Sequence, residues 1–63
     1  MMSLKLKRLE KDMSLRSMAQ KLGISVTTLR VWELEPKKVT IENAHKICEV
    51  LDCEMGDIKE WQK

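Results

Sequence analysis

Apolar residues recur at helical spacing along almost the whole chain of 63 residues. Polar cap residues and turn-forming residues interrupt this pattern and divide it into short segments. We therefore predict an all-α fold, in which five short helices and no strands form one compact domain over residues 1–63. The helices are expected at about 3 to 11, 14 to 22, 25 to 34, 40 to 51 and 55 to 61.

Small polar residues mark where the predicted helices begin, and one glycine marks where a helix ends. Ser14, Ser25 and Thr40 each precede an apolar run, and a hydroxyl at this position accepts a hydrogen bond from an amide of the first turn. Gly23 can take the left-handed conformation that ends many helices. Pro36, with the two lysines that follow it, predicts a loop between the third and fourth helices.

The inward faces of the predicted helices supply the core. In the first helix Leu4 and Leu9, continued by Met13, form an apolar stripe that leaves Leu6 outside. Trp61 has two open roles, since it either closes the core or lies in a dimer interface. The expected core consists of Met18, Leu22, Leu29, Trp32, Ile47 and Leu51. Further inward positions are Ala19, Ile41, Ala44, Cys48, Met55 and Ile58.

The 12 basic and 10 acidic residues are distributed unevenly. Up to Val31 the chain has seven basic and two acidic residues, whereas from Trp32 onward it has five basic and eight acidic ones. A basic half favours contact with a polyanion, although a solvated surface has the same composition.

No apolar run approaches the roughly 20 residues that span a bilayer. The N-terminus has no signal-peptide core, so we expect a soluble, cytoplasmic protein with no membrane contact.

The two cysteines and the one histidine are the candidates for chemistry. Two cysteines are too few for a disulfide-rich secreted scaffold, and they indicate a reducing compartment. His45, Cys48, Glu49 and Cys53 could suggest a metal site, and His45 and Cys48 share a helix face. They give only two or three ligands, however, whereas structural zinc has four. We therefore expect buried, reduced thiols and no metal or other cofactor. No nucleophile has a base and an orienting group, so neither an enzyme nor a small-molecule substrate is expected.

The most informative segment is 15–34, in which two predicted helices are joined by Gly23-Ile24-Ser25. A connection of about three residues is typical of a helix-turn-helix, whose two helices cross steeply. Ala19 is small where the two helices must approach, and the isoleucine of the turn fills the corner between them. Leu29 and Trp32, three residues apart, hold the second helix of the motif to the core.

These positions resemble the helix-turn-helix of the lambda-repressor-like proteins, the Cro/cI or XRE family. The matching residues of the motif are Met18-Ala19, Leu22-Gly23-Ile24-Ser25, Thr28-Leu29 and Trp32-Glu33. Later matches are Ile41-Glu42, Lys46-Ile47, Leu51 and the segment from Met55 to Ile58. The resemblance covers nearly the whole chain. It implies a five-helix transcription regulator that binds double-stranded DNA as a homodimer on a two-fold site.

The resemblance also implies an ion pair between Arg8 and Glu33. Family members often join an arginine of the first helix to a glutamate that ends the recognition helix. Glu33 lies about 40° from Leu29 on a helical wheel, near the core, where an unpaired carboxylate is costly. The guanidinium of Arg8 would satisfy that carboxylate. The alternative is two independent surface charges.

In this family the second helix of the motif enters the major groove, and the first crosses the phosphate backbone. Carried over, the residues that approach base edges are Val26, Thr27 and Val31. Arg30 reaches a base or a phosphate, and Ser14 and Ser25, with the amide ends of their helices, hold phosphates. The remaining basic residues of the implied DNA face are Arg16, Lys21, Lys37 and Lys38.

The sequence departs from the family on this same face. Many members have Gln where this chain has Leu15, and Asn-Gly where it has Leu34-Glu35. The face is therefore unusually apolar, and a second hypothesis is a protein-binding patch made of Leu15, Val26, Val31 and Leu34. A third hypothesis is a MerR-type or excisionase-like winged helix, which the segment Gly23 to Arg30 also resembles. That fold would need a wing strand where residues 40–51 predict a helix.

Overall fold

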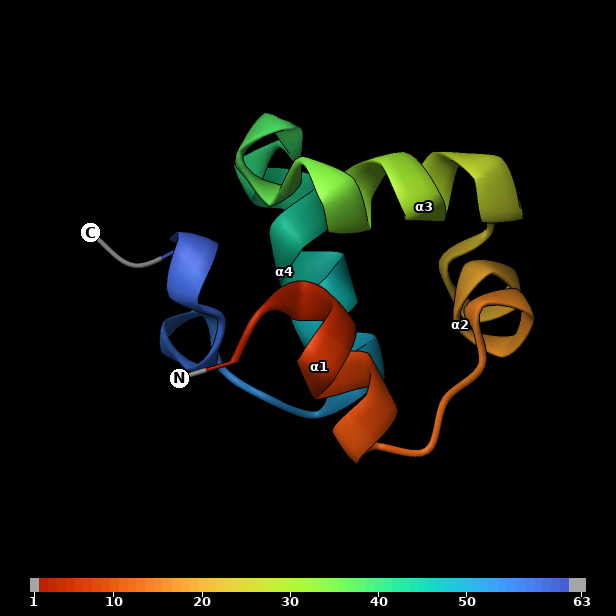
Figure 1. Ribbon diagram of the computed structural model, residues 1–63. Coiled ribbons are helices and arrows are strands. Elements are labelled where there is room, and N and C mark those ends of the chain that lie inside the picture. The colour runs from red at the N-terminus through yellow and green to blue at the C-terminus, as the bar shows by residue number, and fades with distance from the viewer. Residues whose placement is uncertain (1, 62–63) are drawn as a thin grey trace.

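The structure, a computed structural model, describes residues 2–61. This part of the chain forms four α-helices, which are α1 (Leu4–Glu10), α2 (Leu15–Leu22), α3 (Val26–Leu34) and α4 (Ile41–Leu51). Three 3₁₀ turns follow α3 and α4, namely η1 (Pro36–Lys38), η2 (Met55–Asp57) and η3 (Lys59–Trp61). In Figure 1, α3 runs along the top of the molecule while α2 is seen nearly end-on, so the two cross steeply. The predicted all-α class is confirmed.

The predicted hydroxyl caps are present. Ser14, Ser25 and Thr40 each accept a hydrogen bond from the amide three residues further on, at 3.0, 3.1 and 3.2 Å. Ser3 caps α1 in the same way at 3.2 Å. Each hydroxyl satisfies one of the amides that have no partner inside the helix. The starts of all four α-helices in the described residues are therefore set by local chemistry.

Three of the helices end in the same geometry, with one residue in the left-handed conformation. These residues are Asp12, Gly23 and Asp52, with φ of 56°, 72° and 52°. In each case the next amide donates to the carbonyl five residues back, at 3.2, 3.0 and 3.0 Å. This arrangement is the Schellman motif. Gly23 was predicted to end α2, whereas two of the three positions carry an aspartate, which adopts this conformation less readily than glycine.

The core lies where all four helices and the C-terminal segment meet. Its buried side chains are Leu4, Met18, Ala19, Leu29, Ile47, Leu51 and Ile58. Leu22 and Trp32, both predicted as core residues, are half-buried and pack against this cluster. The helical periodicity therefore identified most of the core, because short amphipathic helices must bury their apolar faces against one another.

Two apolar residues predicted to face inward lie outside instead. Leu9 is 49% exposed and Ile41 is 73% exposed. In α1 the inward place is taken by Arg8, which is 5% exposed. Arg8 lies about 40° from Leu4 on a helical wheel, whereas Leu9 lies about 140° away. Ile41 is the first residue of α4 and precedes the buried stripe of that helix.

The predicted fifth helix is wrong. Residues 55–61 form the turns η2 and η3, and between them Ile58 is extended and makes a parallel bridge with Met2. The amide of Lys59 donates to the carbonyl of Met2 at 2.9 Å, whereas a continuous α-helix needs this amide for the carbonyl of residue 55. A contact with the N-terminus therefore interrupts the helix. The inward position of Ile58 was predicted correctly.

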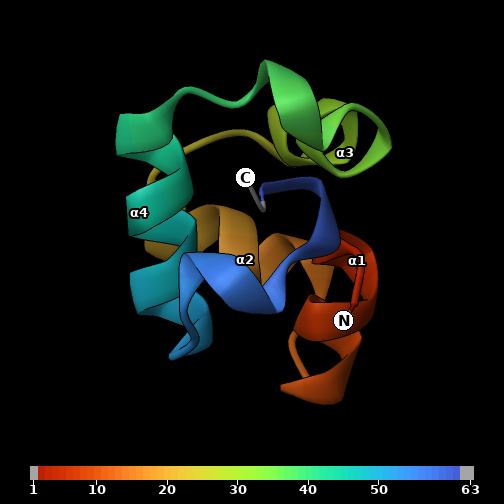
Figure 2. The same cartoon turned by 90° about the vertical axis from the view of Figure 1, so that its left-hand side faces the viewer.

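Trp61 closes the core on the side of η1. Its indole Nε1 donates to the carbonyl of Pro36 at 2.8 Å, and its ring is half-buried against the core. In Figure 2 the C-terminal segment, in blue, runs from the end of α4 across the face of the molecule toward α1 and α3. Segments from the two ends of the chain thus hold the helices together.

Replacing Asp52 with glycine should stabilise the domain. Glycine adopts a φ of 52° without steric cost, and the substitution removes a negative charge from the negative end of α4. We expect the free energy of unfolding to rise by about 0.5–1.5 kcal/mol, measured by urea denaturation. Asp52→Asn is the matched control, because it removes the charge but keeps a side chain. An Asp52→Gly variant no more stable than Asp52→Asn would show that the left-handed backbone carries no cost here.

Candidate nucleic-acid interface

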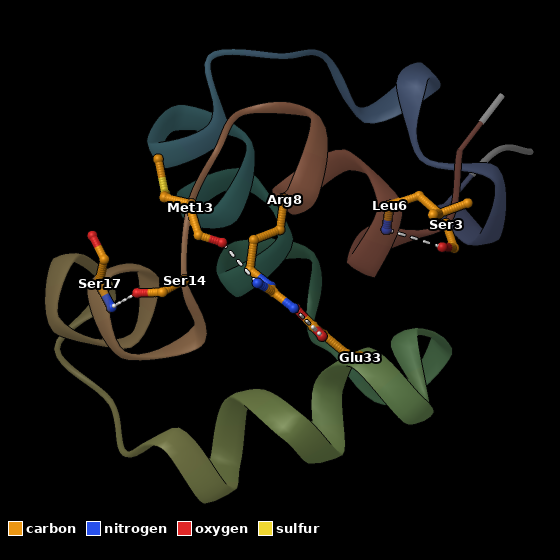
Figure 3. Close-up of polar contacts among 7 residues, drawn as sticks. All are labelled: Ser3, Leu6, Arg8, Met13, Ser14, Ser17 and Glu33. Carbon is orange, nitrogen blue, oxygen red and sulfur yellow. Dashed lines mark hydrogen bonds and ion pairs between the residues drawn. The ribbon is translucent and has the colours of Figure 1, made fainter.

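A buried ion pair sets the position of α3. The Nε of Arg8 donates to Glu33 Oε2 at 2.6 Å, and its Nη2 donates to Glu33 Oε1 at 3.3 Å. The third guanidinium nitrogen, Nη1, donates to the carbonyl of Met13 at 2.7 Å. The Arg8 and Glu33 side chains are only 6% and 8% exposed. Figure 3 shows the guanidinium between the carboxylate of α3 and the segment that joins α1 to α2.

The Arg8–Glu33 pair was predicted and is confirmed, but the Met13 carbonyl was missed. No side-chain pattern identifies that carbonyl, because it is aimed by the backbone turn that follows the left-handed Asp12. The guanidinium therefore joins α1, the α1–α2 connection and the last turn of α3. A charge this deeply buried is tolerated only when its partners are well placed, so the rotation of α3 about its own axis is fixed.

The opposite side of α3 is a continuous exposed face. It carries the residues Thr27, Arg30, Val31 and Leu34, which recur at intervals of three, four and seven and are all exposed. Val31 is 46% exposed and Leu34 is 82% exposed, whereas Leu29 on the other side of the helix is fully buried. The structure therefore brings three of the predicted contact residues, Thr27, Arg30 and Val31, onto one surface.

Two residues of the predicted apolar patch do not share this exposure. Leu15 and Val26 are half-buried and pack against the core cluster. The patch of four apolar residues is therefore reduced to Val31 and Leu34 as exposed members. Val26, at the first position of α3, keeps only part of its surface for a ligand.

Ser14 and Ser25, which cap α2 and α3, are both exposed but differ in what they can offer a phosphate. Ser25 Oγ accepts from the Thr28 amide and also donates to Thr28 Oγ1 at 2.9 Å, so its hydroxyl is committed within the cap. Ser14 Oγ accepts from the Ser17 amide at 3.0 Å, and its hydroxyl hydrogen remains a donor. The dipole and the first amides of α2 and α3 attract anions in addition.

The predicted basic residues are exposed, but one is already paired. Arg16 and Lys21 lie on α2, and Lys37 lies on η1 directly after α3. Lys38 Nζ lies 3.2 Å from Glu35 Oε2. The spacing of three residues between these two charges could have revealed the pair. Glu35 thus offsets one of the positive charges that sequence reasoning assigned to this surface.

Residues 2–61 contain neither a metal-binding cluster nor a membrane-spanning helix. No three His, Cys, Asp or Glu side chains gather there in a way that could hold a metal ion. No helix in this part of the chain is both long enough and apolar enough to cross a bilayer.

The chain matches the family model of the Cro/C1-type HTH DNA-binding domain over residues 4–63. The resemblance to the lambda-repressor-like proteins is thereby confirmed. No match was found among curated proteins or among solved structures. The winged-helix hypothesis required a strand after the motif, and the structure has helix α4 there instead.

Removing one partner of the Arg8–Glu33 pair should destabilise the domain strongly. Arg8→Met leaves a carboxylate buried without a partner, and we expect a loss of about 3–5 kcal/mol in the free energy of unfolding. The double variant Arg8→Met with Glu33→Met should lose much less than the two single variants together. As a control, Glu42→Gln breaks the exposed 3.8 Å pair with Lys46 and should change stability by less than about 1 kcal/mol. If urea denaturation shows that the losses in free energy of unfolding from Arg8→Met and Glu33→Met simply add in the double variant, the two side chains do not stabilise each other.

Proposed function

We propose, because the chain belongs to the Cro/C1-type HTH DNA-binding family, that it regulates transcription by placing α3 in the major groove of DNA. It acts in the cytoplasm as a homodimer on a two-fold site, with each α3 in one half-site. Regulation follows from blocking or recruiting RNA polymerase, without chemistry by the protein itself. The observation that carries this proposal is the exposed face of α3.

The electrostatics of that face support a nucleic-acid ligand. Arg30 stands on α3, Arg16 on α2 and Lys37 on η1, and all three are exposed. In the proposed complex Arg16 and Lys37 contact the phosphate backbone on either side of α3. Ser14 and the first amides of α2 bind a phosphate next to Arg16. Thr27 and Val31 contact base edges, and Arg30 contacts either a base or a phosphate.

A second candidate function is binding of a protein through α3. The observation that favours it is the exposure of two apolar side chains, Val31 at 46% and Leu34 at 82%. A salt titration with generic duplex DNA separates the two functions. Each released counterion contributes a slope of about −0.9 to log K against log salt, whereas an apolar protein-binding patch shows almost no such slope. A binding constant for DNA that does not depend on salt would therefore contradict the DNA proposal.

Arg16→Ala and Arg30→Ala should each weaken DNA binding while leaving thermal stability nearly unchanged. Both side chains are exposed, and each contact with a phosphate that is lost should lower the magnitude of the salt slope by about 1. Lys59→Ala is the charge-matched control, because it removes one positive charge from η3, where the side chain is 60% exposed. A mobility-shift assay at low salt measures the affinities. Equal losses for all three variants would show that only net charge matters.

The apolar character of Val31 predicts a thymine in the recognised site. Val31 has no donor or acceptor and is 46% exposed, and the apolar group that the major groove offers is the thymine methyl. Replacing this thymine with uracil deletes only the methyl and should lower affinity by less than the roughly 1–3 kcal/mol of a bidentate base contact. Sites selected from a random oligonucleotide pool supply the sequence for this test.

The control for that substitution restores the methyl on another base. A 5-methylcytosine paired with guanine presents a methyl group at the same place in the major groove, and affinity should partly return. Val31→Ala should also make the protein insensitive to the uracil substitution. If uracil changes nothing at any position of the selected site, Val31 does not face a base.

A further inference from the structure

The C-terminal end of α4 brings together two thiols that DNA binding does not use. Cys48 is 6% exposed, Cys53 is half-buried, and both are free. The amide of Cys53 donates to the carbonyl of Cys48 at 3.0 Å. Both side chains line the same pocket at the surface. The prediction of a buried thiol therefore holds for Cys48 but only in part for Cys53.

The backbone explains why these two side chains meet. Asp52 is left-handed and ends α4, so Cys48 and Cys53 occupy the two positions of a Schellman motif whose side chains usually make an apolar contact. A disulfide needs Cα atoms about 4.4–6.8 Å apart. The hydrogen bond between the two backbones holds the residues close together, and both side chains line the same surface pocket.

The two thiols differ in access and reactivity. Both line an open pocket of about 570 Å³ at the surface, together with His45, Glu49 and Asp52. Burial, followed by the proximity of Cys53, raises the pKa of Cys48 to about 12. Because the thiolate is the attacking species, Cys53, the more exposed thiol, is the one that reacts first with a reagent from solution.

We propose that Cys48 and Cys53 form a reversible intramolecular disulfide, with a small disulfide such as oxidised glutathione as the oxidant. The Cys53 thiolate attacks one sulfur of oxidised glutathione and releases a glutathione thiolate, which takes up the proton that Cys53 lost. The Cys48 sulfur then attacks Cys53 in the mixed disulfide, and a second glutathione leaves with the Cys48 proton. The protein loses two electrons and two protons, and the glutathione disulfide gains them.

The disulfide joins α4 to the segment that closes the domain. After Cys53 the chain contributes Ile58, which pairs with Met2, and Trp61, which bonds to Pro36. A covalent link at the start of this segment limits the freedom of the unfolded chain. The oxidised domain is therefore harder to unfold, while the exposed face of α3 lies on another element and is unchanged.

The test compares disulfide formation in the folded and the unfolded chain. The full chain is equilibrated in a fixed glutathione buffer, with and without urea, quenched with acid and analysed by mass spectrometry. If folding presents the thiols to each other, the ratio of intramolecular disulfide to dithiol should be on the order of tenfold or more higher in the folded protein. Cleavage of the backbone after Glu49 separates Cys48 from Cys53. The fragments that carry the two cysteines therefore stay linked only if the intramolecular disulfide has formed.

Two further measurements complete the test. The oxidised protein should melt on the order of 10 °C higher than the reduced protein, and reduction should reverse the rise. Cys48→Ala and Cys53→Ala should give only mixed disulfides with glutathione. An equal or lower ratio in the folded wild-type chain, or products limited to mixed disulfides and intermolecular dimers, would overturn the proposal.

Discussion

The buried pair of Arg8 and Glu33 is the constraint on which the rest of the structure depends. Two charges that are only 6% and 8% exposed have lost most of their hydration, and this cost is offset only while the fork of hydrogen bonds keeps its geometry. The pair therefore fixes α1 against α3. It also explains how α1, with only seven residues, exists at all, because a helix of that length is unstable without tertiary contacts.

The same constraint decides which side of α3 faces the solvent. Glu33 points toward Arg8 and Leu29 toward the core, so Thr27, Arg30 and Val31 must point away. The capping hydroxyl of Ser25 and the left-handed Gly23 set where α3 begins and how it leaves α2. Position along the helix is thus determined locally, and rotation about its axis is determined by a residue 25 positions earlier.

Features that depend on neighbours in sequence were predictable, and features that depend on distant contacts were not. The caps, the turn at Gly23 and most of the core follow from periodicity and short motifs. Leu9 was misplaced because Arg8 takes the inward position, and the fifth helix was wrong because the Lys59 amide bonds to Met2. The prediction of the Arg8–Glu33 pair depended on the family resemblance. Helical periodicity alone places Glu33 near the core but does not identify its partner. The residues of the candidate interface were named from the sequence. The hydrogen bond of Ser25 to Thr28 and the ion pair of Lys38 with Glu35 were not predicted.

The low net charge and the apolar side chains of the proposed DNA face both limit the affinity that a single domain can reach. The net charge is only +2, and Glu35 already offsets Lys38 near the end of α3, so counterion release would give a single domain only limited affinity for DNA. Val31 contributes contact area but no bidentate hydrogen bond. A protein of this kind gains affinity chiefly by linking two weak half-site contacts, because the second contact then forms at a high effective concentration. The proposed homodimer would therefore let an α3 with one exposed arginine and two exposed apolar side chains bind DNA in the presence of salt.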